Sequence, residues 1–159
     1  MKQTEKKAIL VVSFGTSYEK TRKATIEAIE NEIANAYPAH RIYRAWTSKM
    51  IIAKLKKRDN IHVCTVKEAM EQMISDGITH VILQPTHVIN GIENDLMKED
   101  ALSYREHFRS IRFGDPLLTS QADTQEIIHA VAQEFSYLKR EEALVLMGHG
   151  TTHYANTVY

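Results

Sequence analysis

The chain has 159 residues, which is long enough for one domain with a substantial core and too short for two. Hydrophobic residues make up 43% and charged residues 25%, as in ordinary globular proteins. Lys and Arg (20) balance Asp and Glu (20), so no net charge favours nucleic acid or an anionic membrane. A single cysteine, Cys64, excludes an internal disulfide and a zinc site built on several cysteines.

The sequence shows no export signal and no membrane span. The charged residues 1–7 are followed by an apolar run that is too short for the core of a signal peptide. No stretch approaches the roughly 20 apolar residues that cross a bilayer. We therefore expect a cytoplasmic protein.

Strand and helix patterns alternate along the chain. Four short strands are expected: residues 9–14, 41–46, 80–84 and 110–113. Helices are expected between and after them: residues 18–36, a helix that follows the cap Ser48, and residues 65–73, 92–107 and 121–137. Because helices separate the strands, the sequence predicts an α/β fold. Its parallel sheet of about four strands is covered by helices on both faces, in three α/β/α layers.

Local signals predict some helix boundaries and faces. Thr65 and Glu68 match a capping box at the start of one helix. The pair Tyr37-Pro38 is expected to end the first long helix. Three isoleucines are expected on one face of that amphipathic helix: Ile26, Ile29 and Ile33.

One pattern occurs twice. Residues 8–17 form an apolar run that ends in a glycine turn followed by hydroxyl residues, and residues 143–152 repeat it about one small domain later. In the second copy, His149 stands where the first has Phe14. The repeat predicts a two-lobed protein with chemistry between its lobes. We expect residues 1–140 to form the first lobe, and 141–159 the first strand and active-site turn of a truncated second lobe.

Parallel sheets bind ligands at the carboxyl ends of their strands, which makes three loops candidates: residues 13–17, 85–94 and 148–156. The first has two open interpretations. It can cradle an anion on the next helix, or it is a tight turn in which Ser17 caps that helix. The candidate binding residues are Ser13, Phe14, Gly15 and Thr16. The loop lacks a P-loop lysine and a three-glycine fingerprint, which disfavours a nucleotide.

The second loop gathers an imidazole and two carboxylates beyond a buried strand. His87 is a candidate for contact with substrate, with a structural role as the alternative. Glu93 and Asp95 fall in the first turn of a helix, where acids often only complement the helix dipole. Both roles stay open for Glu93, whereas Asp95 fits the dipole role better.

The third loop places His149 between Gly148 and Gly150 at the end of an apolar run. Neutral imidazole binds borderline divalent metals and accepts protons near neutral pH. His149 is therefore the leading candidate for a metal ligand and catalytic base. Gly150 argues against a helix that would place His153 on the same face. We assign structural or surface roles to the other histidines, at positions 40, 62, 80, 107 and 129, and an inert buried role to Cys64.

Four segments, residues 11–17, 45–52, 87–91 and 147–150, together resemble the anaerobic cobalt chelatases of cobalamin biosynthesis. The resemblance runs along the whole chain in order. It implies a class II chelatase, a lyase that inserts Co(II) into sirohydrochlorin without ATP. It also implies two similar α/β lobes around a tetrapyrrole cleft. By the same resemblance His149 is a metal ligand and proton acceptor, and Glu93 is an acid that faces the cleft.

The family continues for about one further lobe, which brings a second histidine and a glutamate to the metal. We therefore expect the 159-residue chain alone to have little or no activity. The alternatives are a non-catalytic metal- or tetrapyrrole-binding module and, more weakly, a nucleotide-binding domain suggested by the α/β pattern. The sequence does not distinguish Co(II) from Fe(II) or Ni(II), and it leaves a homo-oligomer open.

Overall fold

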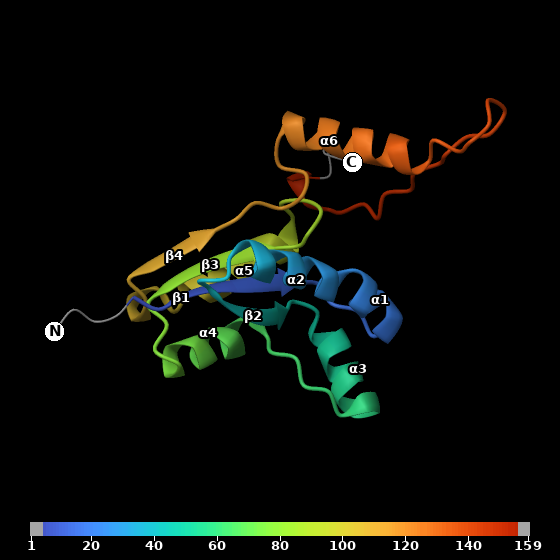
Figure 1. Ribbon diagram of the computed structural model, residues 1–159. Helices are drawn as coiled ribbons and strands as arrows, with labels where there is room; N and C mark the ends of the chain where they lie inside the picture. Colours follow the sequence, from blue (N-terminus) through green and yellow to red (C-terminus); the bar gives the residue numbers. More distant parts are fainter. Residues whose placement is uncertain (1–4, 156–159) are drawn as a thin grey trace.

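The computed structural model describes residues 5–155, with a four-stranded parallel sheet at its centre (Figure 1). The strands are β1 (Lys7–Ser13), β2 (Arg41–Trp46), β3 (His80–Pro85) and β4 (Ser110–Phe113). Their order across the sheet is β2-β1-β3-β4. All pairings are parallel, so the carboxyl ends of the four strands share one edge. This confirms the fold class predicted from the alternating pattern.

Residues 156–159, which end the predicted segment 141–159 and include the last residue of the third loop, lie outside the described residues.

Helices cover both faces of the sheet. The helices on one face are α1 (Glu19–Ala24) and α2 (Ile26–Ala36), and those on the other are α4 (Val66–Ser75) and α5 (Ile92–Leu102) (Figure 1). Helix α3 (Lys49–Asp59) follows β2, and the 3₁₀ turn η1 (Arg105–His107) precedes β4. None of the helices in the described part of the chain is both long and apolar enough to span a bilayer.

The main core lies between the sheet and helices α4 and α5. Alternate residues of β1 point into it, such as Leu10 and Val12, where they meet Met70 of α4 and Met97 of α5. A smaller cluster surrounds the fully buried Trp46 at the carboxyl end of β2, where Leu55 of α3 also packs. The second cluster anchors the edge of the sheet at which ligands of parallel sheets bind.

The local capping predictions are confirmed. The Thr65 hydroxyl accepts a hydrogen bond from the Glu68 backbone N–H (3.3 Å), and the Glu68 carboxylate accepts one from the Thr65 N–H (2.7 Å). Ser48 caps α3 through the N–H of Ile51 (3.4 Å). These contacts span three residues, so the sequence alone specifies them.

Several predicted boundaries are wrong. The helix expected over residues 18–36 breaks at Thr25, whose φ and ψ of −122° and −76° are not helical. The Thr25 hydroxyl donates to the Thr21 carbonyl (2.7 Å), which competes with the helical ladder. The helix expected to reach residue 107 ends at Leu102, and the last helix, α6 (Gln121–Glu134), ends three residues early.

The final part of the chain leaves the sheet. Helix α6 extends away from the sheet and has no buried residue (Figure 1). The apolar run 143–147, expected to form a strand, forms none, and Val145 and Met147 are 82% and 93% exposed. A strand needs a neighbour to satisfy its backbone, and the described residues offer none to this run.

Candidate active-site cleft

The three predicted loops meet around one cleft of about 750 Å³. The cleft opens at the carboxyl ends of β1 and β3, where the chain passes from strand to loop. All seven residues predicted for the site line it: Ser13, Phe14, Gly15, Thr16, His87, Glu93 and His149. Residues 14 and 149, which occupy matching positions of the repeat, therefore face the same space.

The first loop packs against the ring of the buried Trp46. Gly15 has a φ of +102°, and a Cβ there would lie 2.6 Å from the Trp46 ring. Only glycine meets both conditions without displacing the ring. The Ser13 hydroxyl accepts a hydrogen bond from the Thr86 hydroxyl (2.8 Å), which joins the first loop to the second.

The proposed helix cap at Ser17 is absent. Helix α1 begins after Tyr18, which makes no side-chain cap, and the Ser17 carbonyl instead accepts from Arg58 (2.6 Å). The Tyr18 N–H donates to the Thr16 hydroxyl (3.3 Å). Helix α1 has only six residues, so its dipole gives little support to the predicted anion cradle.

His87 is a half-buried imidazole beside the cleft. Both of its ring nitrogens are buried and have no hydrogen-bond partner among the described residues. Burial lowers the pKa of His87 from its ordinary value, and the nearby Glu93 opposes that shift only in part. The imidazole is therefore neutral near pH 7, with two nitrogens that a ligand can satisfy.

Glu93 and Asp95 diverge although they share the first turn of α5. Glu93 lines the cleft and is half-buried, whereas Asp95 is exposed and lies 3.1 Å from the Nε2 of His153. Between them, the fully buried Asn94 donates to the side chain of Asn90. This bond fixes the start of α5 and so the direction of Glu93.

His149 is exposed on the turn that follows the run 143–147. Its Nδ1 lies 3.0 Å from the carbonyl of Gly150, so Nε2 remains for a ligand. Gly150 has a φ of +73°, a conformation that favours glycine, and it lines the cleft together with His149. His153 does not line the cleft.

The cleft has an apolar wall that the sequence reading missed. Ile29 of α2 lines it, together with Val88 and Ile92 beyond β3. Thr21 of α1 and Thr25, at the break between the two helices, also line the cleft. Ile29 shares its predicted helix face with Ile26, but it is 42% exposed whereas Ile26 is buried. Its periodic position was the available signal, since periodicity shows that a side chain is apolar without showing what covers it.

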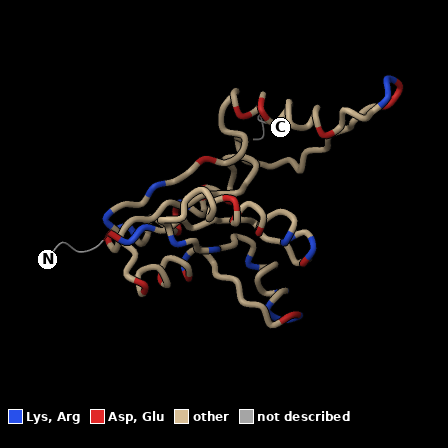
Figure 2. The backbone as a smooth tube through the Cα atoms, in the orientation of Figure 1, with Lys and Arg blue, Asp and Glu red and all other residues tan. Residues whose placement is uncertain are grey.

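Charge is sparse around the cleft. Glu93 is the one residue among those lining it that carries a formal charge, apart from the titratable histidines. In Figure 2 the tail around residues 143–155 and the loop between β3 and α5 are largely free of the coloured charges that mark the helices. A charged ligand group here therefore meets imidazole, hydroxyl and backbone groups.

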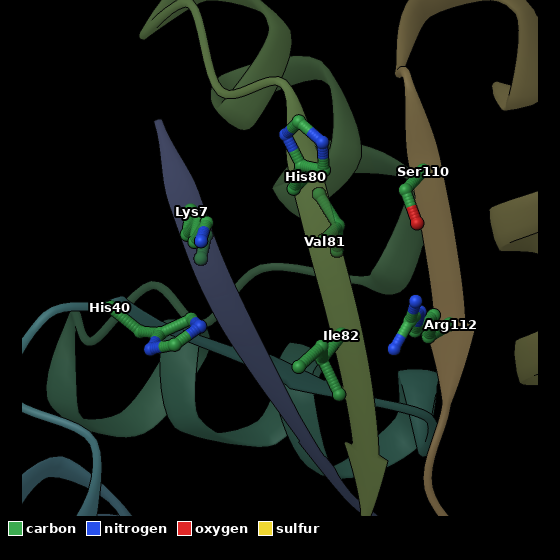
Figure 3. A pocket seen from close by; sticks show the side chains of 8 residues that line it. Lys7, His40, His80, Val81, Ile82, Ser110 and Arg112 are labelled. Carbon is green, nitrogen blue, oxygen red and sulfur yellow. The ribbon is translucent and has the colours of Figure 1, made fainter. Parts of the chain in front are cut away.

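A second hollow, of about 210 Å³, lies at the opposite edge of the sheet (Figure 3). Lys7, His80 and Ser110 line it from the amino ends of β1, β3 and β4. His40 and Arg112 complete its polar lining. It contains no predicted site residue, and parallel sheets bind ligands at the other edge. The cleft is therefore the better candidate.

Comparison with known proteins agrees with the geometry. The model of the cobalt chelatase (CbiK) family matches residues 7–159. The sirohydrochlorin cobaltochelatase of Salmonella typhimurium is 39% identical over 154 residues, which cover 97% of this chain and 58% of the relative. The sirohydrochlorin cobaltochelatase CbiKC of Nitratidesulfovibrio vulgaris is 30% identical over 161 residues, 97% of this chain and 55% of the relative.

The chain thus spans a little over half the length of the curated relatives it matches. The family match covers almost all of it, including the three loops of the cleft. The resemblance found in the sequence motifs is confirmed: the chain belongs to the cobalt chelatase (CbiK) family.

Proposed function

We propose that this chain contains the metal-binding lobe of a sirohydrochlorin cobaltochelatase. Such an enzyme is a class II chelatase, which inserts Co(II) into sirohydrochlorin without a nucleotide. The observation that carries the proposal is the convergence of His149, Glu93 and His87 on one cleft, in a chain of the cobalt chelatase family. Co(II) and the tetrapyrrole are both substrates here, and the activity belongs to the complete protein.

We further propose a two-lobed organisation, with residues 1–140 as the first lobe and 141–159 as the start of the second. Two observations support it. The run 143–147 repeats the sequence pattern of β1, and its side chains are exposed, as expected for a strand without its sheet. The turn that carries His149 nevertheless reaches back to the first lobe's cleft.

His149 is proposed as the ligand that holds Co(II) before insertion. Its exposed imidazole can approach the cleft with Nε2, and imidazole is a good ligand for borderline divalent metals. Insertion requires that the metal lose water and that two pyrrole N–H groups lose their protons. A histidine that releases the metal to the macrocycle can accept one of these protons.

Glu93 is proposed to accept the second proton. A half-buried carboxylate at the wall of the cleft also attracts the cation and offsets part of the cost of stripping its water. His87 is proposed to bind substrate, because its neutral imidazole has two buried nitrogens without a partner. Pyrrole N–H groups and substrate carboxylates are groups that such an imidazole recognises.

The rest of the lining suits the body of a tetrapyrrole. The isoleucine and valine side chains offer an apolar surface to the macrocycle, and the first loop offers Ser13, Thr16 and backbone groups to its polar edge. Phe14, 48% exposed, supplies an aromatic face. The apolar wall also lowers the local dielectric, which strengthens the attraction between Glu93 and the cation.

The test is absorbance-monitored insertion of Co(II) into sirohydrochlorin, run on the 159-residue chain and on the complete protein where the coding sequence continues. His149→Ala in the complete protein should abolish insertion and leave the circular dichroism spectrum unchanged. His129→Ala is the matched control and should retain activity, because this exposed histidine of α6 does not line the cleft. Normal turnover by His149→Ala would remove the proposed role of this residue.

The same assay separates the alternative of a non-catalytic binding module. Such a module would bind the tetrapyrrole, seen as a shift of its absorption bands, without insertion by the complete protein. We expect the 159-residue chain to bind weakly and to insert little or no cobalt, since under the two-lobed proposal it supplies only one side of the cleft.

A further inference from the structure

A second group of metal-ligating side chains lies outside the cleft. The ligand atoms of His62, Cys64 and Glu68 all fall within 4.8 Å of one another. None of the three lines the cleft. His62 and Cys64 instead border a separate groove of about 270 Å³. From the sequence, His62 is expected to have a structural or surface role and Cys64 to be an inert buried thiol.

Local backbone geometry brings the three side chains together. Residues 61–65 connect α3 to α4 without regular secondary structure, and the Trp46 N–H donates to the Cys64 carbonyl (2.9 Å). This bond ties the segment to the end of β2. Helix α4 starts directly after Thr65, and Glu68 lies in its first turn, from which the carboxylate reaches back towards the preceding segment.

The capping box already orients one ligand. Oε2 of Glu68 accepts from the Thr65 N–H (2.7 Å) and from the Thr65 hydroxyl (3.0 Å). The other carboxylate oxygen, Oε1, accepts no hydrogen bond within the described range 5–155. Metal-binding carboxylates are typically held in this way, with one oxygen fixed by an outer partner and the other turned to the ion.

The thiol is poised in a similar way. Cys64 is half-buried, and its Sγ lies 3.9 Å from Oε1 of Gln72, one turn further along α4. Burial and the neighbouring Glu68 raise the pKa of the Cys64 thiol. A bound cation reverses this balance by stabilising the thiolate, so metal binding here releases a proton.

Neighbouring positive charge is neutralised within the groove. Arg22 and Arg44 line it, but Arg22 pairs with Glu27 (3.1 Å) and Arg44 binds the carboxylate of Glu30. A divalent cation therefore meets no unopposed guanidinium at this position.

The distances between the three ligand atoms also suit a small ion. Ligands about 2.0–2.3 Å from a tetrahedral metal lie about 3.3–3.8 Å apart, which the exposed His62 and Glu68 reach by small rotations.

We propose that His62, Cys64 and Glu68 form a second divalent-metal site, with imidazole nitrogen, thiolate sulfur and carboxylate oxygen as ligands and water in the fourth position. This donor set favours borderline ions such as Zn(II) and Co(II) over Mg(II) or Ca(II). The site is independent of the proposed chelatase cleft, because it shares no ligand with it.

The single cysteine makes the test specific. Metal-free, reduced protein is titrated with Co(II) alone and followed by near-ultraviolet absorbance, where thiolate-to-cobalt charge transfer appears. Because Cys64 is the only cysteine in the sequence, any such band reports this site and no other. We expect a band that saturates at one Co(II) per chain, shows tetrahedral visible bands, and disappears on addition of Zn(II).

Variants separate a three-ligand site from a lone thiol. Cys64→Ser should abolish the band. His62→Ala and Glu68→Gln should each weaken Co(II) binding by more than about tenfold, the loss typical of removing even an orienting partner. Glu68→Gln preserves the capping box, so its effect is not one of unfolding. His149→Ala, in the cleft, should leave the band unchanged.

Three results would overturn the proposal. The first is no charge-transfer band at Co(II) concentrations well above that of the protein. The second is a band that Cys64→Ser removes but His62→Ala and Glu68→Gln leave at full affinity, which would mean adventitious binding to one thiol. The third is loss of the band in His149→Ala with the fold intact. None of them bears on cobalt insertion in the cleft, so the two proposals fail separately.

Discussion

The imidazole of His153 donates to the carboxylate of Asp95 on α5, with Nε2 and Oδ2 3.1 Å apart. The direction of this bond follows from the other ring nitrogen. Nδ1 accepts the backbone N–H of Ala155 (3.1 Å), so the proton of the neutral ring sits on Nε2. The contact joins the segment after the His149 turn to the helix that presents Glu93, and so ties two walls of the cleft.

Removing this contact should loosen the tail without unfolding the lobe. In His153→Ala we expect amide hydrogen exchange of residues 151–155 to accelerate several-fold, because an ionic hydrogen bond is lost. The effect is limited by the exposure of Asp95. Exchange in the β1–β3 core should not change. Equal acceleration in His129→Ala, which leaves the His153–Asp95 bond intact, would contradict the assignment.

Gly15→Ala should destabilise the lobe by about 2–4 kcal/mol. The substitution forces an L-residue into a positive-φ conformation and drives its Cβ to 2.6 Å from the Trp46 ring. Gly77→Ala is the matched control, since its φ is +71° but the nearest atom is a flexible lysine tip 3.6 Å away. That control should cost only about 1 kcal/mol. Urea denaturation measures the free energy of unfolding of both variants. Equal losses of this free energy would mean that the close approach to Trp46 does not contribute to the effect of Gly15→Ala.

The two capping boxes should differ in importance. Thr65→Ala, at the start of α4, should lower the free energy of unfolding by about 1 kcal/mol, because four buried residues of α4 pack in the core. Ser120→Ala removes the equivalent cap of α6, which has no buried residue. It should accelerate hydrogen exchange within α6 and leave the global unfolding midpoint in place. A matching drop in both midpoints would show that α6 folds as part of the core.

The pH dependence of Thr65→Ala follows from Glu68. Hydrogen bonds from Thr65 lower the pKa of Glu68 from its ordinary value of 4.5. A lowered folded-state pKa contributes stability that is fully present above the unfolded value and disappears as pH falls through the folded one. The stability difference between wild type and Thr65→Ala should therefore shrink below about pH 4.5. Because the Thr65 backbone N–H remains in the variant, a difference that stays constant down to pH 3 would exclude a contribution from the hydroxyl to the lowered pKa of Glu68.

Tyr43 should titrate late. Burial, together with the hydrogen bond that its hydroxyl donates to Asp76 (2.6 Å), raises the pKa of Tyr43 to about 12. A raised folded-state pKa contributes stability that is complete below the unfolded value of 10 and is lost as pH rises towards 12. Tyr43→Phe should therefore lose less stability than wild type between pH 9 and pH 11, estimated from the ordinary tyrosine range.

Absorbance titration of the phenols provides the check on Tyr43. The latest-ionising fraction should vanish in Tyr43→Phe and persist in Tyr37→Phe, which changes a tyrosine that is 52% exposed. If the two variants titrate alike, the buried Tyr43–Asp76 contact is not present in solution.

The sequence predicted what is decided locally. The Thr65 capping box and the Ser48 cap each involve residues three apart, so the pattern contained all the interacting groups. The parallel sheet followed from alternation, and its carboxyl edge then brought the three loops together. His149 was found because a histidine between two glycines has little local structural purpose.

What the sequence did not predict depends on distant partners. The helical spacing places Ile29 on one face with Ile26 and Ile33, but it does not predict that Ile26 is buried and Ile29 is 42% exposed. The run 143–147 has the composition of a strand, and pairing requires a neighbour that the described residues do not provide. The sequence also did not predict that the side chains of His62 and Cys64 lie close to the carboxylate of Glu68, because this depends on how the segment before α4 folds.

The hydroxyl contact between Ser13 and Thr86 has a consequence for affinity. This hydrogen bond joins two rims of the cleft, one after β1 and the other after β3, before any ligand binds. A rigid guest that meets a rigid host loses little additional freedom on docking, so more of the contact energy appears as binding. A planar, rigid ligand therefore binds such a pre-joined cleft at a lower entropic cost than a flexible ligand of the same size.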